Sequence, residues 1–181
     1  KLSGSLFYKL ISNWIQWVPN SVGSYKPINL QQVYSRGSET SWQLAYSKNK
    51  FKVQLKCITS YVLSTVNKTK LDGGETLNKQ LIYTPRYTIN SSLTLRYKTL
   101  AISYFHNYTG YRFAASDNSV WLKPYHYSTL RATYSYQFQK IEVELFGNIN
   151  NVLNKQIEIL DNRPIALRYF EIGVQLNYKQ T

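Results

Sequence analysis

The stretch YFEIGVQLNY, residues 169–178, decides the fold. Its residues alternate: Phe170 and Ile172 fall on one side of an extended strand, while Glu171 and Gln175 fall on the other. Successive side chains of a β-strand point to opposite faces, so the stretch predicts a strand with one apolar and one polar face. Such a strand fits either a half-buried soluble sheet or a membrane barrel whose polar side faces a wet lumen.

The same alternation recurs along the chain and predicts an all-β fold, an antiparallel transmembrane β-barrel segment of about eight strands. The expected strands are residues 3–17, 34–47, 51–66, 89–97, 100–110, 128–138, 141–150 and 169–178. Short connections alternate with long ones, which are expected at residues 18–33, 67–88, 111–127 and 151–168. Short turns at one end and long loops at the other are typical of outer-membrane barrels, where the long loops lie outside the cell. Strands 141–150 and 169–178 are expected to pair antiparallel with their acids facing water.

Composition agrees with a membrane barrel. The chain has 181 residues, of which 17 are Tyr, 7 are Phe and 4 are Trp, yet its mean hydropathy is −0.39. Aromatic girdles and a polar lumen produce this combination. The net charge of +13 comes from basic residues spread over turns, loops and inward positions rather than from one patch. We therefore expect anionic lipid head groups or an anionic ligand as partners, and no nucleic acid. The single cysteine, Cys57, excludes an internal disulfide.

Prolines and acids follow the same division. All five prolines are expected in the long connections and none in a strand. All nine acids fall in the long loops or on the inward face, where Glu39, Glu142, Glu144 and Glu171 lie. The expected lipid-facing set is apolar and aromatic: Leu6, Tyr8, Leu10, Trp42, Leu44, Tyr46, Val53, Leu55, Leu93, Leu95, Tyr97, Leu130, Ala132, Tyr134, Tyr136 and Phe138.

Several motifs carry a family resemblance. The run INNVLNK at residues 149–155, followed by Arg163-Pro164 and FEIGVQLNY at residues 170–178, resembles the C-terminal end of TonB-dependent outer-membrane receptors. RGSE at residues 36–39 and LIYTP at residues 81–85 resemble other recurring signals of that family. NWIQWVP at residues 13–19 resembles the cobalamin-receptor branch in particular.

The resemblance implies that residues 1–181 are the C-terminal portion of a plugged, 22-stranded receptor barrel in the bacterial outer membrane of a Gram-negative organism, with the plug domain not in this sequence. It implies energised transport of a scarce, large ligand, a cobalamin or an iron chelate (siderophore), rather than enzymatic catalysis, and no cofactor. The implied partners are outer-membrane lipid and lipopolysaccharide, the rest of the same barrel and its plug, the TonB complex through the absent N-terminal part, and a surface lipoprotein.

Position selects the candidate ligand residues. Large amphipathic or cationic side chains of the outer loops and strand ends suit a planar or anionic ligand, and these are Trp14, Trp17, Tyr25, Tyr111, Arg112, Trp121 and Tyr125. Trp17, Trp121, Tyr125 and Arg112 are expected to converge above the lumen. The alternative is that most of the seven form the outer aromatic girdle, to which Tyr83, Tyr87 and Tyr178 are also assigned.

The terminal strand also carries an expected membrane-assembly signal, which consists of Phe170, Ile172, Val174, Leu176 and Tyr178. No catalytic triad is visible, and the two histidines, His106 and His126, have no spacing that joins them to a metal set with Cys57. Glu142 and Glu144 share a face and are expected to form a polar network with Arg96 or Arg131 rather than an acid/base pair.

Two rival classes stay open at this point. Eight strands can close on themselves, so the chain could be a complete small outer-membrane barrel with a structural, adhesive or rim-hydrolase role. A soluble eight-stranded ligand carrier is the third option, and it would need its apolar residues pointing inward.

Overall fold

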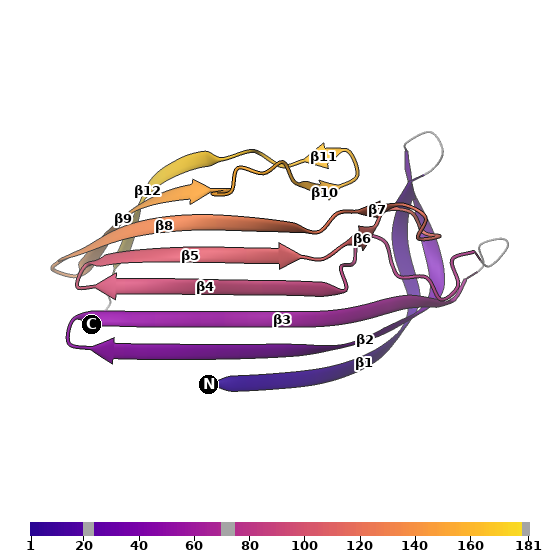
Figure 1. Cartoon of the computed structure of the whole chain (residues 1–181), viewed down its shortest axis with the longest axis horizontal. Helices are drawn as coiled ribbons and strands as arrows, with labels where there is room; N and C mark the ends of the chain where they lie inside the picture. The colour runs from indigo at the N-terminus through magenta and orange to yellow at the C-terminus, as the bar shows by residue number, and fades with distance from the viewer. Residues whose placement is uncertain (20–23, 70–74, 179–181) are drawn as a thin grey trace.

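One large antiparallel sheet dominates the computed structural model, which describes residues 1–19, 24–69 and 75–178 (Figure 1). Its eight strands follow each other in the order β1-β2-β3-β4-β5-β8-β9-β12. Their bounds are β1 Leu2–Pro19, β2 Tyr25–Lys48, β3 Phe51–Lys68, β4 Tyr87–Tyr97, β5 Leu100–Thr109, β8 Tyr125–Phe138, β9 Ile141–Asn150 and β12 Tyr169–Tyr178. Two small hairpins complete the fold: β6 Arg112–Phe113 with β7 Trp121–Leu122, and β10 Glu158–Leu160 with β11 Arg163–Pro164. The described residues contain no helix that is long and apolar enough to cross a membrane.

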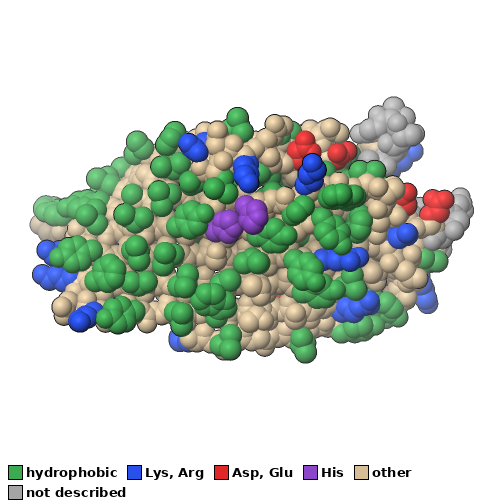
Figure 2. Space-filling model, in the orientation of Figure 1, with side chains coloured by type: hydrophobic (Ala, Val, Ile, Leu, Met, Phe, Trp, Pro, Cys, Tyr) green, Lys and Arg blue, Asp and Glu red, His purple; other side chains and the backbone are tan. Residues whose placement is uncertain are grey.

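The strand register separates two faces. One row of directly paired residues runs across seven strands on a single face: Leu44, Leu55, Leu93, Tyr104, Leu130, Ile149 and Phe170. Figure 2 looks onto this outer face and shows hydrophobic side chains spread over it. On the inner strands of this row, Leu44 is 62%, Leu93 36% and Tyr104 37% exposed, and on the edge strands Leu6 and Ile172 are 87% and 92% exposed. An apolar face this open to its surroundings suits lipid.

The pairing predicted for the last two long strands is confirmed. β9 and β12 pair antiparallel, with Glu144 opposite Gln175 and Asn148 opposite Glu171. Leu145 lies opposite Val174 on the other face. The bounds of both strands agree with the prediction, because each strand is a clean period-two segment that ends at a turn or loop.

The first long connection was predicted wrongly. Residues 18–33 are mostly strand, because β1 and β2 continue as a hairpin in which Pro19 pairs with Tyr25. The prediction that no proline lies in a strand is also wrong, since Pro19, Pro27 and Pro164 lie in β1, β2 and β11. At Pro27, β2 pairs with β1 alone, because its pairing with β3 begins only at Gln32. The missing N–H of a proline costs no ladder bond on such an open side.

The three predicted short connections are confirmed, and each is a two-residue turn. Their first residues, Asn49, Lys98 and Gln139, have φ angles of 54°, 53° and 50°. Positive φ at this position is the geometry that matches the twist of a tight hairpin. All three turns lie at the same end of the sheet, opposite β6, β7, β10 and β11 (Figure 1).

Two inward glycines are covered by the ring of the residue opposite. Phe146 pairs with Gly173, and a Cβ atom on Gly173 would lie 2.4 Å from its ring. Phe7 covers Gly37 in the same way, 2.8 Å from the corresponding Cβ position. The Arg131 guanidinium lies 4.0 Å from the centre of the Phe146 ring on the same inner face. The glycines therefore make room for rings that lie flat along the inner wall.

The small buried core lies at the long-loop end of the sheet. Leu30, Val33 and Val66, from β2 and β3, pack with Leu81 of the β3–β4 connection. A buried Gln80 precedes Leu81, and its backbone exchanges two 2.9 Å hydrogen bonds with the side chain of Asn118 from the β6–β7 connection. These contacts hold two outer loops against each other and against the sheet.

Candidate functional site

The candidate site is the cluster of loops around β6, β7, β10 and β11, which lies at the same end of the sheet as the end of β1 and the start of β2 (Figure 1). Two clefts border the β10–β11 hairpin, and Tyr125 lines both. The first has a volume of about 530 Å³ and is lined by Trp121, Leu122, Lys123, Pro124, Tyr125, Gln156, Ile157, Glu158 and Asp161. The second has a volume of about 470 Å³ and is lined by Asn90, Asn107, Thr109, Tyr125, Tyr127, Ile159, Ile165, Ala166 and Tyr169.

Arg112 joins the segments that form these clefts. Its guanidinium donates hydrogen bonds to the backbone oxygens of Glu158 at 2.6 Å and Gly110 at 3.3 Å, and it lies 4.9 Å from the centre of the Tyr125 ring. Arg112 is only 3% exposed, and burial lowers the pKa of its guanidinium against the opposing effect of the nearby Tyr125 and Tyr83 hydroxyls. Arg112 thus fixes the β10–β11 hairpin over the sheet and would reach a ligand only through Tyr125.

Two aromatic residues, Trp121 and Tyr125, line the first cleft, and Tyr111 contacts Trp121. The Tyr111 ring makes edge contacts with Phe113 at 5.6 Å and Trp121 at 6.5 Å, and the Arg86 guanidinium lies 5.7 Å from its centre. Trp121 is 54% exposed and presents an open ring at the cleft edge. Flat rings beside polar and charged groups suit a large ligand with planar parts.

Tyr83 links three outer segments and was missed as a site residue. Its backbone N–H donates to the Phe113 oxygen at 2.7 Å. Its buried hydroxyl has no hydrogen-bond partner among the described residues and lies near Tyr25 and Asp161. Burial, followed by the contact with Tyr25, raises the pKa of Tyr83 to about 12. The girdle assignment of Tyr83 is therefore wrong, because the residue lies half-buried among the loops, in the β3–β4 connection before the start of β4. Tyr83 belongs to the LIYTP run at residues 81–85, which is one of the runs that resemble family motifs. A motif in an expected loop does not reveal which other segments of the chain it will contact.

The second cleft lies on the inner face and carries residues that sequence reasoning did not single out. Asn90 and Asn107 face each other across β4 and β5 and are hydrogen-bonded through their side chains. Tyr127 and Tyr169 share this wall, and Ile159 and Ile165 of the hairpin segment supply an apolar side. Tyrosine hydroxyls and amides beside aliphatic groups suit a ligand with polar substituents on an apolar frame.

The INNVLNK run explains how the hairpin is held. Asn151 is fully buried with a φ angle of 50°, and its side chain donates to the backbone oxygens of Lys155 at 2.9 Å and Ala166 at 3.2 Å. The Asn154 side chain accepts a 3.0 Å hydrogen bond from the N–H of Arg168. Asparagine suits both tasks because it tolerates positive φ and bonds the backbone of nearby residues. The motif therefore anchors both ends of the β10–β11 segment.

A polar network lies on the inner face below the loops. Arg131 and Glu144 form a 3.0 Å ion pair, which confirms the expected contact between lumen carboxylates and Arg131. Glu171 accepts hydrogen bonds from Asn150 at 2.8 Å and Asn148 at 3.2 Å. These acids are paired structurally, and the described residues hold no group of three or more metal-ligating side chains.

The seven predicted ligand residues divide into two groups. Arg112, Tyr125, Trp121 and Tyr111 come together around the first cleft, and Tyr25 reaches the same cluster through Tyr83. Trp14 and Trp17 lie on β1, 37% and 60% exposed, and in the described part of the chain neither ring contacts this cluster. The expected convergence therefore includes Trp121, Tyr125 and Arg112 but shows no contact with Trp17, and ligand binding by all seven stays a prediction.

The sequence profile of the family described as TonB dependent receptor-like, beta-barrel matches residues 1–152. The chain belongs to this family. A comparison with curated protein sequences finds no match.

Solved structures share the fold of this TonB-dependent receptor barrel. BauA, the ferric preacinetobactin receptor from Acinetobacter baumannii, is similar with a TM-score of 0.65 and 17% identity over 96% of this chain and 26% of its own. The FrpB iron transporter from Neisseria meningitidis is similar with a TM-score of 0.64 and 18% identity, and the match covers 96% of this chain and 28% of FrpB. The ferric enterobactin receptor PfeA from Pseudomonas aeruginosa is similar with a TM-score of 0.58 and 19% identity, and the match covers 97% of this chain and 27% of PfeA. The chain spans about a quarter of the length of these proteins.

The two histidines of this receptor barrel lie on its outer face (Figure 2). The His106 Nε2 and His126 Nδ1 atoms are 3.1 Å apart, and the His106 Nδ1 atom is 2.8 Å from the Ser128 hydroxyl. Tyr104 donates to the same hydroxyl at 2.8 Å. The imidazoles are thus hydrogen-bonded within the wall, which fits two polar groups that approach the membrane interface.

Proposed function

We propose that residues 1–181 form the C-terminal part of the barrel of an outer-membrane receptor that takes up a scarce, large ligand by energised transport. The family membership supports this proposal, since TonB-dependent receptors are outer-membrane proteins of Gram-negative bacteria. The single observation that carries it is the strand register, which places a continuous apolar row on the outer face and the acids Glu144 and Glu171 on the inner face. A wall with lipid on one side and a wet lumen on the other is what such a receptor needs.

An iron chelate is our first candidate ligand. The three solved relatives named above are described as a ferric preacinetobactin receptor, an iron transporter and a ferric enterobactin receptor. Cobalamin is the second candidate and rests on the resemblance of residues 13–19 alone. The clefts around Tyr125 and Trp121 would contact such a ligand at the long-loop end of the barrel, where the exposed Trp121 ring offers a flat surface.

The partners follow from the same proposal. The free edges of β1 and β12 would pair with further strands of the same barrel, and a plug domain would occupy its lumen. The TonB complex would act through a part of the protein outside residues 1–181. Membrane lipid and lipopolysaccharide would contact the apolar outer face, and a surface lipoprotein would meet the outer loops.

A complete small barrel is the alternative. It would require β1 to pair with β12, whereas the described sheet ends at these two strands without joining them. The alternative therefore lacks the closing contact that it needs.

Equilibrium binding and uptake by the full receptor test the proposal. Iron-loaded catecholate and hydroxamate chelates and cobalamin are offered to cells that carry the receptor and to cells that lack it. Receptor-dependent uptake that stops when the membrane potential is collapsed supports the transporter. Uptake of none of these ligands, with the receptor folded in the outer membrane, would refute it, while uptake of cobalamin alone would reverse the order of the candidates.

A further inference from the structure

The two histidines meet on the outer face of the wall, near the ends of β5 and β8 that lead to the outer loops. His106 pairs in register with Ser128, and His126 pairs with Tyr108. The diagonal between the two imidazoles brings the His106 Nε2 atom to 3.1 Å from the His126 Nδ1 atom. His126 is exposed, and Figure 2 shows both rings at the surface. A small ligand can therefore approach the two facing nitrogens from outside the wall.

The distance between the facing nitrogens fits a shared metal ion. Zn²⁺ binds imidazole nitrogen at about 2.0–2.1 Å. Two such bonds at the tetrahedral angle place the nitrogens about 3.3 Å apart, and two at a right angle place them about 2.9 Å apart. The 3.1 Å separation lies between these values. The two rings thus offer two coordination positions to one ion with only a small adjustment.

The Ser128 hydroxyl fixes the orientation of His106. Its oxygen lies 2.8 Å from the His106 Nδ1 atom and accepts a 2.8 Å hydrogen bond from Tyr104. Ser128 is fully buried, so its position in the wall is set by packing. A histidine that binds a metal usually donates the hydrogen of its other ring nitrogen to a nearby acceptor. A metal between the two rings moves the hydrogen there to the far nitrogen of its own ring, which for His106 is the Nδ1 atom beside Ser128.

Two tyrosines hold the imidazoles in place. Tyr104 stacks on His106 with ring centres 6.1 Å apart, and Tyr108 lies against His126 at 4.9 Å. Because these neighbours already restrict the two rings, little side-chain freedom is left to lose when an ion binds.

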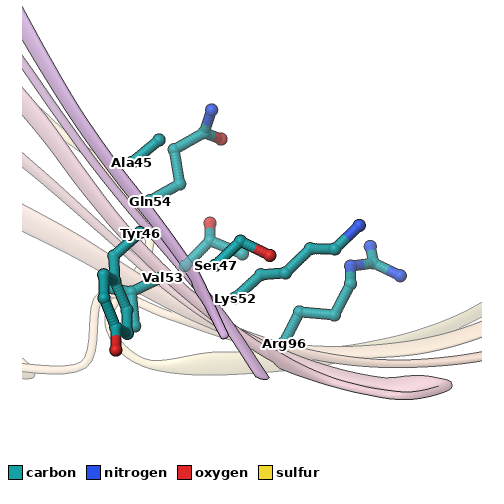
Figure 3. A pocket seen from close by; sticks show the side chains of 8 residues that line it. Ala45, Tyr46, Ser47, Lys52, Val53, Gln54 and Arg96 are labelled. Carbon is teal, nitrogen blue, oxygen red and sulfur yellow. The ribbon is translucent and has the colours of Figure 1, made fainter. Parts of the chain in front are cut away.

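A cation is better placed between the histidines than at the cationic pair of the inner face. There, Lys52 and Arg96 pair in register beside a cavity of about 260 Å³, and their side chains extend together away from the sheet (Figure 3). That pair repels a metal cation. The residues in register with the two histidines are Ser91, Ser128 and Tyr108, and these are uncharged. Two neutral imidazoles in such surroundings can bind a cation through their nitrogen lone pairs.

We propose that His106 and His126 form a binding site for one divalent transition-metal ion of the Zn²⁺, Ni²⁺ and Cu²⁺ class on the outer face of the wall. Imidazole suits these ions, whereas Mg²⁺ and Ca²⁺ take oxygen ligands. Water would complete the coordination shell on the exposed side. The bound ion would tie the start of β8 to the end of β5 and stabilise the fold as its free concentration rises above its dissociation constant.

The site is separate from the proposed uptake of a large ligand. Asn107 and Tyr127, the next residues along the two strands, point to the other face and line the second cleft. Binding of a metal ion at the histidines and binding of a chelate at the clefts can therefore be measured independently.

Metal titration of the full receptor, purified in detergent without a histidine tag, tests the proposal. Calorimetry with Zn²⁺ should show one ion that is lost in H106Q, in H126Q and in the double variant H106Q/H126Q. Each single variant should bind this ion roughly a hundredfold more weakly, because the second imidazole acts as an intramolecular ligand. The double variant should lose no further ion, since both histidines share one. The matched control Ser91→Ala changes the residue opposite His106 and should bind as the wild type does.

Electron paramagnetic resonance of bound Cu²⁺ identifies the ligands. The difference between the wild-type and double-variant spectra should show splitting from two directly bound nitrogens. Equal binding of Zn²⁺ by the wild type and the double variant would overturn the proposal. Loss of a separate ion in each single variant would also overturn it, because the histidines would then act independently.

A measurement on the unaltered receptor requires no variant to fold. Diethyl pyrocarbonate modifies accessible imidazole nitrogens, and peptide mass spectrometry locates the modified residues. Zn²⁺ should protect His106 and His126 together at the same ion concentration, whereas Mg²⁺ should protect neither. Failure of Zn²⁺ to protect the pair would refute the site, even where a variant is lost through misfolding, which gels detect as loss of the heat-modifiable form.

Discussion

A lysine at Leu93 should destabilise the folded receptor far more than the same lysine at Tyr97. Both residues lie on the outer face of β4, where Leu93 pairs with Leu55 and Tyr97 with Phe51. The change from Leu93 to Lys places an ammonium group against lipid, whereas a lysine at Tyr97 reaches the polar interface beside the β4–β5 turn.

The depth of each position sets the magnitude. Tyr87 and Tyr97 bound β4 and are ten residues apart. At about 3.3 Å per residue and a tilt of about 40°, they differ in height by about 25 Å, the usual height of the apolar band. Leu93 is four residues from Tyr97, hence about 10 Å deeper and near the middle of the band. A lysine there should cost about 2–4 kcal/mol, and at Tyr97 about 0–1 kcal/mol.

Urea titration of the full receptor in lipid vesicles measures both costs as differences in the free energy of unfolding. Tyr97→Lys is the matched control, since strand, face and charge are the same and only depth differs. Equal losses for the two variants, or a loss below about 0.5 kcal/mol for Leu93→Lys, would refute the assignment of this face to lipid.

Three further predictions concern assembly, packing and binding. Tyr178→Asp puts a charge in the interfacial girdle of β12, so the heat-modifiable receptor should be missing from outer membranes; wild-type amounts would contradict the assembly signal. Gly173→Val should cost about 1–3 kcal/mol because its Cβ would overlap the Phe146 ring, and adding Phe146→Leu should recover part of the loss in the same urea assay, whereas no recovery would exclude this clash as the cause. Trp121→Ala or Trp17→Ala should weaken ligand binding by roughly 1–3 kcal/mol with the barrel still folded, as measured by equilibrium titration. Unchanged affinity in both variants would assign these rings to the girdle.

Sequence reasoning worked best where the backbone alone sets the pattern. The faces of β9 and β12 and the positions of the short turns followed from period-two alternation. It failed where a second segment decides the outcome. The β1–β2 hairpin extends past the alternating residues because its two strands bond each other through their backbones, and Pro27 is tolerated there because β3 has already ended its pairing.

The candidate site shows the same division. The sequence selected Arg112 and Tyr125 as large side chains in outer loops, but it could not show that they lie against each other or that Arg112 is buried. Tyr83 was assigned to the girdle, and Tyr127 and Tyr169 were not singled out, because a tyrosine in an aromatic-rich chain carries no local signal of what it contacts.

The sequence by itself determined which side chains share the apolar face and which share the polar face, since successive residues of any strand point to opposite faces whatever lies beside it. Only the tertiary structure decided which outer loops meet. The hydrogen bond from Arg112 to the backbone oxygen of Glu158 spans 46 residues, and a carbonyl acceptor is present at every residue, so no residue type marks it in advance. The same holds for Lys52 and Arg96: their faces follow from alternation, but the strand register alone places the two charges directly opposite each other.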